Sequence, residues 1–240
     1  EKLQLAQREL NTFIYKSSHD LKGPLSSILG LIHLLETESD NSKGSPCVQM
    51  IRQSAEKLDR MLNELLNVVR IKREKIYPEV IDFSKEISEI MKTLSTSEGY
   101  DFLKKEILVE TQKELRTDRR LLSSVLQNLI DNAIKYQTRQ SDSFVSIKIV
   151  DHMHGVKIEI EDNGCGFDEK TRGNIFTMFN RGQNAAKGNG LGLYVVKNAI
   201  DRLGGYIDFN GGENKNTQFT IFLPDLYSTE QWEEPSSVFS

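Results

Sequence analysis

Residues 18–35 read SHDLKGPLSSILGLIHLL, a histidine and a carboxylate followed by a proline and an apolar helical pattern. Apolar positions recur at steps of three and four along the first helix, as Leu3, Ala6, Leu10, Phe13, Ser17, Leu21, Leu25, Ile28, Ile32 and Leu35. Three consecutive steps of four between Phe13 and Leu25 shift the phase of this seam, and Pro24 removes one helical hydrogen bond there. The pattern predicts a loosened helix over about residues 1–37.

His19 falls midway between two seam positions, about 200° round the helix from each, so it points away from the seam. An exposed imidazole beside Asp20 is typical of a phosphoacceptor, because one ring nitrogen can attack while the other is held by a hydrogen bond. A plain surface histidine is the other interpretation of this stretch alone. His33 is followed by a leucine instead of a carboxylate, and we interpret it as ordinary helix surface.

The composition limits the class of protein. The 240 residues are 38% hydrophobic and 28% charged, which fits one or two globular domains with a long helical part. The formal net charge of −4 argues against a nucleic-acid binder. No uncharged run reaches membrane-spanning length, and the chain opens in mid-pattern without a methionine or a signal peptide. Cys47 and Cys165 have no metal-ligand spacing, so we expect a cytoplasmic fragment, with any membrane anchor outside this sequence.

A second amphipathic helix is predicted over residues 46–75, after a polar and turn-rich segment. Its seam is apolar throughout, with Val48, Ile51, Ala55, Leu58, Leu62, Leu65 and Val69. Two such helices joined by a short loop make an antiparallel hairpin, and one hairpin leaves its apolar stripes uncovered. We therefore expect a homodimer with a four-helix bundle over residues 1–76. A hairpin packed on the rest of its own chain is the alternative.

The periodicity changes after Tyr77-Pro78, a plausible hinge because proline disfavours helix at the preceding residue. Strands are predicted at 79–83, 107–111, 143–150, 156–161, 206–210 and 218–223. Helices are predicted at 84–94, from a cap at Thr117 or Asp118 to Tyr136, at 168–176 and at 191–203. This mixture predicts an α+β two-layer sandwich over 77–224, with helices on one face of a mixed sheet. Residues 225–240 form a tail without periodicity.

The helix before Tyr136 carries a polar cluster in the segment LQNLIDNAIKY. Spacings of four and three put Asn128, Asn132 and Lys135 on one helical face. Asparagine carbonyls are suitable hard-oxygen ligands for Mg²⁺, and a lysine supplies a positive charge for phosphate. A solvated polar face is the other interpretation.

Two glycine-rich segments follow. The first is Asp162-Asn163-Gly164-Cys165-Gly166, in which the glycines allow a tight turn. The carboxylate of Asp162, at the end of the predicted strand, can accept a hydrogen bond from an exocyclic amine such as that of adenine. A simple turn is the alternative. In the second, Gly188-Asn189-Gly190-Leu191-Gly192-Leu193, backbone amides at a helix N-terminus can bind an anion. It lacks the preceding strand of a dinucleotide fingerprint and the ending of a P-loop, and a glycine-rich helix cap is the alternative.

In this order, these segments resemble the catalytic core of the sensor histidine kinases of two-component signalling. SHDLKGPL looks like the H box of that family, NLIDNAIKY the N box, EDNGCGF the G1 box, IFTMFNRG the F box and GNGLGL the G2 box. The resemblance covers about residues 10–224. It implies a dimerisation and phosphotransfer hairpin followed by a Bergerat-type (HATPase) ATP-binding domain.

The resemblance also implies roles for individual residues. His19 would be phosphorylated by Mg-ATP, with Asp20 orienting it and acting as general base, and the phosphoryl group would pass to a response-regulator receiver domain. Asn128 and Asn132 would hold Mg²⁺, Lys135 would meet the phosphates, and Tyr136 and Asp162 would contact the nucleoside. The remaining implied pocket and lid residues are Gly164, Gly166, Phe176, Phe179, Arg181, Gly188, Gly190, Leu191 and Gly192. For the two phenylalanines an ordinary core position, and for Arg181 an exposed surface position, is the alternative.

One position departs from the family pattern. Four residues after the histidine the family often has Thr or Asn, which helps to position water for dephosphorylation of the partner, whereas this chain has Gly23. Weak or absent phosphatase activity is therefore expected.

Two other functions stay open, an ATPase of the gyrase and mismatch-repair type and a non-catalytic nucleotide-binding dimeric adaptor. The His19-Asp20 hairpin argues against the first, and the presence of His19, Asn132 and Asp162 argues against the second.

Overall fold

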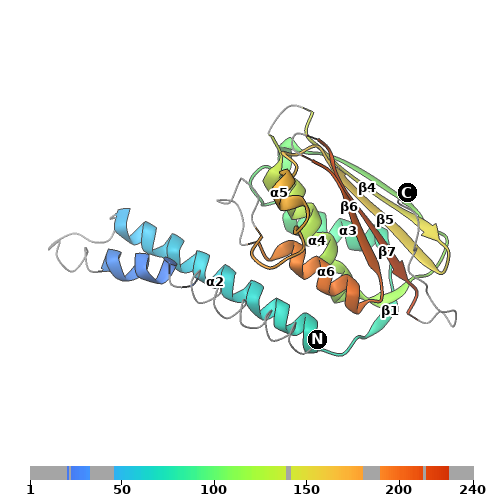
Figure 1. The fold of residues 1–240 in the computed structure, drawn as a ribbon, viewed down its shortest axis with the longest axis horizontal. Helices are drawn as coiled ribbons and strands as arrows, with labels where there is room; N and C mark the ends of the chain where they lie inside the picture. The colour runs from blue at the N-terminus through green and yellow to red at the C-terminus, as the bar shows by residue number, and fades with distance from the viewer. Residues whose placement is uncertain are drawn as a thin grey trace. The chain divides into compact units, whose positions relative to one another are not determined.

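The computed structural model describes residues 21, 23–32, 46–138, 142–180, 190–212 and 215–226 (Figure 1). Contacts between residues divide the chain into two compact units, Glu1–Val68 and Val69–Ser240, and each is described by itself. This division falls earlier than the predicted boundary between residues 76 and 77. The assignment of residues 1–76, 77–224 and 225–240 to separate domains stays a prediction.

The first unit is helical where it is described. Residues 21 and 23–32 are helical, and helix α2 (Pro46–Arg73) matches the second predicted helix closely. Leu25 and Ile32, two members of the first seam, keep exposed fractions of 47% and 40% in the single chain. Their covering by a second copy stays a prediction. Among the helices that the structure describes, none is long and apolar enough to cross a membrane.

The second unit contains a five-stranded mixed sheet with the order β2-β4-β5-β7-β6. The strands are β2 (Lys104–Glu110), β4 (Phe144–His152), β5 (Gly155–Asp162), β6 (Tyr206–Asn210) and β7 (Thr217–Pro224). Strand β2 is parallel to β4, with Lys104 opposite Phe144, and the other neighbours are antiparallel. The mixed sheet predicted from the alternating segments is confirmed.

The helices of this unit are α3 (Phe83–Leu94), α4 (Arg119–Tyr136), the short α5 (Glu169–Arg172) and α6 (Gly192–Arg202). Figure 1 shows α4 and α6 on one face of the sheet. Alternation along β5 explains the two layers, because Val156, Ile158 and Ile160 are buried and the intervening side chains are not. The core lies between the layers and includes Leu122, Leu126, Ile130, Ile147, Ile149, Val196, Ile200 and Ile221.

Helix α4, which carries the predicted polar cluster, begins at a buried cap. Asp118 accepts hydrogen bonds from the backbone N–H groups of Arg120 (3.1 Å) and Leu121 (3.2 Å), so it is the cap where the sequence allowed Thr117 or Asp118. Burial alone would raise the pKa of Asp118. Hydrogen bonds from the Tyr77 backbone N–H, the Arg120 side chain and the Leu121 backbone N–H outweigh burial, and this pKa is lowered.

Three local predictions differ from the structure. The predicted strand at 79–83 is the shorter β1 (Pro78–Val80), because Asp82 caps α3 by accepting from the Lys85 N–H. Its partner β3 (Arg116–Asp118) is too short to have been recognised from alternation. The predicted helix at 168–176 is reduced to α5, which ends at Arg172 and is followed by turns that begin at Gly173.

Residues 97–106, for which no helix or strand was predicted, contain a 3₁₀ turn at Tyr100–Phe102 and then enter β2. The start of the predicted tail is paired with the body of the second unit. The Asp225 N–H donates to the His154 carbonyl, and the Leu226 N–H donates to the Arg116 carbonyl. The rest of the predicted tail lies outside the described residues.

Candidate functional site

Most of the predicted site residues lie in the part of the chain that the structure describes. These are Asn128, Asn132, Lys135, Tyr136, Asp162, Gly164, Gly166, Phe176, Phe179, Gly190, Leu191 and Gly192. His19, Asp20, Arg181 and Gly188 lie outside the described residues, so their roles stay predictions. The arrangement below is built from the first set.

The polar face of α4 approaches the start of α6. The Asn128 side-chain amide donates to the Ser124 carbonyl at 2.7 Å, which leaves its Oδ1 atom available to another group. A Cβ atom on Gly192 would lie only 2.9 Å from that oxygen. The glycine therefore lets the N-terminus of α6 come close to the asparagine, so the N-box and G2-box residues lie together.

Farther along the same helix, Asn132 is half-buried and Lys135 is exposed. Lys135 forms an ion pair with Asp131 one turn earlier. The predicted lysine is thus held on the helix surface by a neighbouring carboxylate. Leu191, at the end of the glycine segment, is only 2% exposed, so its side chain belongs to the core and only its backbone can face a ligand.

Asp162 is the most perturbed carboxyl group of the site. It ends β5, is only 9% exposed, and accepts a hydrogen bond from the Gly164 N–H at 2.8 Å. Burial raises the pKa of Asp162 to about 6, although the Gly164 hydrogen bond acts in the opposite direction. Within the described part of the chain, the Gly164 N–H is the donor to this buried carboxyl group, whose oxygens can accept further hydrogen bonds from a ligand.

The turn after Asp162 docks on the C-terminus of α4. The Cys165 N–H donates to the Tyr136 carbonyl at 3.0 Å. A Cβ atom on Gly164 would lie 2.8 Å from both the Tyr136 carbonyl oxygen and Asp162 Oδ1. Only glycine fits this gap without a shift, so the residue joins the acid-bearing strand to the asparagine-bearing helix.

Gly166 is required by the backbone of the same turn. Its φ of +68° lies in the left-handed region, and a Cβ atom there would collide with the Gly212 carbonyl oxygen. The turn is thus wedged between α4 on one side and the segment before β7 on the other.

Asn163, which the sequence reasoning passed over, fastens this turn to β4. Its Oδ1 accepts from the Phe144 N–H at 2.8 Å, and its Nδ2 donates to the Asp142 carbonyl at 3.0 Å. The feature of the sequence that could have indicated this role is an amide side chain, able to donate and to accept hydrogen bonds, directly after a predicted strand. Its partners are distant in the sequence and could not be predicted from it.

The residues on either side of 181–189 are joined by a backbone contact. The Phe179 N–H donates to the Gly190 carbonyl at 2.8 Å, and both residues have positive φ values, 59° and 70°. Phe176 contacts the ring of Phe219 edge-on, with centroids 6.5 Å apart. Phe219 also contacts Phe167 and Phe209, an aromatic cluster that separate sequence motifs did not predict.

The donor set fits a hard cation better than a soft one. Among the described residues, no group of three or more His, Cys, Asp or Glu side chains is arranged to hold a metal. The available Asn128 oxygen and the half-buried Asn132 amide are neutral oxygen donors, which suit Mg²⁺ when phosphate oxygens and water complete its shell. The residues present therefore fit a magnesium–nucleotide complex.

Two family models match successive parts of the chain. The model described as "His Kinase A (phospho-acceptor) domain" matches residues 9–74. The model described as "Histidine kinase-, DNA gyrase B-, and HSP90-like ATPase" matches residues 117–226. The second match includes every described residue of the site.

Two curated relatives that match the chain are sensor kinases. The sensor histidine kinase YvrG of Bacillus subtilis is 30% identical over 236 residues, which is 93% of this chain and 39% of that protein. The sensor protein kinase WalK of Staphylococcus aureus is 29% identical over 96% of this chain and 39% of its own length. The chain thus spans well under half of these two relatives.

Solved structures share the fold. The Acinetobacter baumannii histidine kinase AdeS aligns with a TM-score of 0.71 and 22% identity, over 87% of this chain and 98% of that chain. The histidine kinase ThkA, in complex with the response regulator protein TrrA, aligns with a TM-score of 0.72 and 20% identity, over 92% of this chain and 64% of that one. The two ordered family matches and the curated relatives confirm the expected family: the chain belongs to the sensor histidine kinases of two-component signalling.

Proposed function

We propose that this chain transfers the γ-phosphoryl group of Mg-ATP to His19 and then to an aspartate of a response-regulator receiver domain. The observation that carries the proposal is the convergence of three motifs, with Gly164 against the end of α4 and Gly192 against Asn128. This convergence gathers an adenine acceptor, neutral oxygen donors and a helix N-terminus. The phosphoacceptor match at residues 9–74 of the same chain supports a recipient histidine in that segment.

The nucleoside end of the proposed site belongs to Asp162. Its ionised carboxylate would accept a hydrogen bond from the exocyclic amine of adenine, whereas guanine presents a carbonyl at that position. Gly164 and Gly166 form the turn after this carboxylate, and a Cβ atom on Gly164 would lie 2.8 Å from Asp162 Oδ1. Tyr136, at the end of α4, is proposed to contact the nucleoside on the other side.

The phosphate end belongs to α4 and to the start of α6. Asn128 and Asn132 would hold Mg²⁺, which when bound neutralises charge on the phosphates during transfer. Lys135 would add a positive charge, and the backbone of Gly188, Gly190, Leu191 and Gly192 would donate N–H groups to phosphate oxygens. Phe179 would anchor the loop after it, and Arg181 would reach the γ-phosphate.

In the transfer step, an imidazole nitrogen of His19 forms a bond to the γ-phosphorus as the bond to the bridging oxygen of ADP breaks. Asp20 would accept a hydrogen bond from the other ring nitrogen, orient the ring and act as general base. The second transfer moves the phosphoryl group from this nitrogen to a carboxylate oxygen of the receiver domain. These domains would act in the cytoplasm, where ATP is available.

The partners are proposed from the first unit. A homodimer would cover the apolar faces of the two helices, since Leu25, Leu29 and Ile32 are exposed in the single chain. A response regulator would dock near His19, a proposal supported by the neighbour ThkA, whose structure contains a response regulator.

Gly23 offers no side chain to position water, so we propose weak phosphatase activity. Dephosphorylation of the partner well above its own rate would contradict this.

Incubation with γ-labelled Mg-ATP tests the proposed reaction. The expected result is protein label that survives alkali and is lost in acid, as a phosphoramidate should be, and that is absent in Asp162→Asn. ATP turnover without protein label would favour the gyrase-type ATPase. Nucleotide binding with neither turnover nor label would favour the adaptor.

A further inference from the structure

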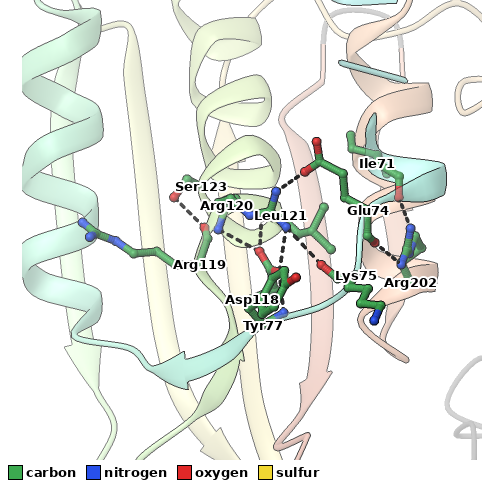
Figure 2. A network of polar contacts seen from close by, with 10 residues as sticks. All are labelled: Ile71, Glu74, Lys75, Tyr77, Asp118, Arg119, Arg120, Leu121, Ser123 and Arg202. Carbon is green, nitrogen blue, oxygen red and sulfur yellow. Dashed lines mark hydrogen bonds and ion pairs between the residues drawn. The ribbon is translucent and has the colours of Figure 1, made fainter. Parts of the chain in front are cut away.

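The end of α2 is fastened to α6 by one arginine. Figure 2 shows Arg202 directed at the end of α2, where it donates to the Ile71 carbonyl in the last turn at 2.5 Å and to the carbonyl of Glu74, the residue after the helix, at 2.7 Å. The last carbonyl groups of a helix have no partner within the helix, so this guanidinium caps them. Ile71 is only 4% exposed, and the Lys72 ammonium lies 5.4 Å from the centre of the Tyr194 ring of α6.

A second arginine fastens the residues that follow. Arg120, in the first turn of α4, forms ion pairs with Glu74 and with Asp118 (3.1 Å) and donates to the Lys75 carbonyl at 3.2 Å (Figure 2). Asp118 also accepts from the Tyr77 N–H at 2.9 Å, and it is only 1% exposed. The same carboxylate therefore starts α4 and holds the connector after α2.

The separate two-stranded sheet of β1 and β3 continues this attachment. Pro78 lies opposite Asp118 and Val80 opposite Arg116 in the β1–β3 ladder. From Ile71 to Val80 the chain is thus bound to α6, α4 and β3 in turn. Rotation at Tyr77-Pro78, the hinge suggested by the sequence, would break the Tyr77–Asp118 hydrogen bond and strain this ladder.

Helix α6 links this attachment to the nucleotide motif. Its first residue, Gly192, lies against Asn128, and its last, Arg202, caps α2. The helix has 11 residues and is therefore about 16 Å long. A rigid helix of this kind sets the position of the α2 end relative to the proposed phosphate site.

We propose that Arg202 is a positioning residue for phosphoryl transfer to the histidine, acting through residues 71–77. In this inference, which rests on the proposed kinase function, residues 71–77 travel with the nucleotide-binding part. The movement that brings nucleotide to the histidine then takes place in α2 before Ile71. Long helices can curve gently without losing their backbone hydrogen bonds, whereas a hinge after Ile71 would have to break several contacts that are partly buried.

The first test is proteolysis without nucleotide. Arg202→Ala should speed tryptic cleavage after Arg73 and Lys75 severalfold, because the connector loses its cap, and Arg202→Lys should give an intermediate rate. Asp201→Ala is the matched control, since this exposed neighbour pairs only with Lys197 among the described residues. Equal cleavage of all variants would overturn the attachment.

The second test is the rate of label formation from γ-labelled Mg-ATP. Arg202→Ala should lower the rate about tenfold or more with unchanged KM for ATP and unchanged binding of a fluorescent nucleotide, and Arg202→Lys should partly restore it. Unchanged label would overturn the positioning role, and faster label would make the contact inhibitory instead. If the wild type forms no acid-labile label, the kinase proposal and the positioning role are both overturned. The rates of tryptic cleavage would still show whether Arg202 holds residues 71–77 in place.

Hydrogen exchange tests where the movement takes place. The Tyr77 N–H should stay protected during turnover with Mg-ATP, because it donates to a buried carboxylate that moves with it. Loss of that protection on addition of Mg-ATP would put the hinge at Tyr77-Pro78 and overturn the inference.

Discussion

At the scale of single residues, the candidate site depends on one carboxylate whose ionised form is disfavoured by burial, and on glycines that lack a side chain where the turn packs closely. Asp162 is buried with a raised pKa, and Gly164 fits between that carboxylate and the end of α4. Groups held in an unfavourable ionisation state are common where a ligand later supplies the missing interaction. Both features yield predictions with matched controls.

The pKa of Asp162 predicts opposite effects on stability and on binding. A pKa raised to about 6 means that the group contributes stability below its unfolded pKa, and that this contribution is lost as the pH rises through 6. Asp162→Asn should therefore raise the free energy of unfolding without nucleotide at pH 7.5, by at most about 3 kcal/mol, and leave it unchanged near pH 4. Denaturant titration at the two pH values measures this.

Binding should follow the ionised carboxylate. The ATP affinity of the wild type should fall about tenfold between pH 7.5 and pH 5, because protonation removes the acceptor for the adenine amine. Asp162→Asn should bind weakly at both values, and its residual pH dependence reports the phosphates alone. Equal pH dependence in the two proteins would contradict the assigned role.

Gly164→Ala tests the close approach at the turn. The added Cβ would meet the Tyr136 carbonyl and Asp162 Oδ1 at 2.8 Å, so we expect a loss of about 1–3 kcal/mol in stability and weaker ATP binding. Gly173→Ala is the control, since its Cβ would meet nothing within 4 Å, and its effect should stay within about 0.5 kcal/mol. Thermal unfolding of the two variants, with and without ATP, separates the outcomes.

At the scale of elements, the sequence predicted most helices and strands because their periodicity is local. Helix α2, strand β6 and the β4–β5 pair were found from spacing alone. The β1–β3 pair was missed, because a three-residue strand has no period and exists only through its distant partner. Helix α5 was predicted too long because propensity does not reveal where the turns after Gly173 begin.

The site shows the same limit. Asn128, Asn132 and Lys135 could be assigned to one helical face because their spacing is local. The Asn163 contacts with Phe144 and Asp142, the aromatic cluster around Phe219 and the Arg202 cap join elements far apart in the chain. No spacing rule predicts such pairs, so the sequence suggests candidate reactive groups but does not reveal the residues that contact and position them.

The caps of α3 and α4 should differ in strength. Asp82→Ala removes an exposed cap and should cost about 1 kcal/mol. Asp118→Ala should cost about 2–4 kcal/mol, because it also leaves the Tyr77 N–H without its acceptor and removes one of the acceptors of the Arg120 side chain. Equal losses in denaturant titrations would show that the connector contacts add nothing.

The pH dependence of the Asp118 contribution has the sign opposite to that of Asp162. Its pKa is lowered in the fold, so its stabilisation is present above the unfolded value of about 4 and is lost as the pH falls through the folded pKa. The difference in unfolding free energy between wild type and Asp118→Asn should therefore shrink in acid.

At the scale of the whole molecule, the chain contains a helical part that matches a phosphoacceptor domain, followed by an α+β sandwich that matches an ATPase domain. Leu25 and Ile32 remain exposed in the single chain, and a helix with an uncovered apolar stripe needs a partner. The double variant Leu25→Gln, Ile32→Gln should convert the proposed dimer to monomer in sedimentation velocity. Ser26→Gln, on an exposed polar position of the same helix, should leave the dimer intact. A dimer that survives the double variant would disprove the proposed interface.

The most direct test of the central claim compares two histidines of the same chain. Wild type, His19→Ala and His33→Ala are incubated with γ-labelled Mg-ATP, and acid-labile, alkali-stable label on the protein is measured. We expect label in wild type and in His33→Ala and none in His19→Ala, with nucleotide binding equal in all three. Label that persists in His19→Ala, or that disappears only in His33→Ala, would contradict it.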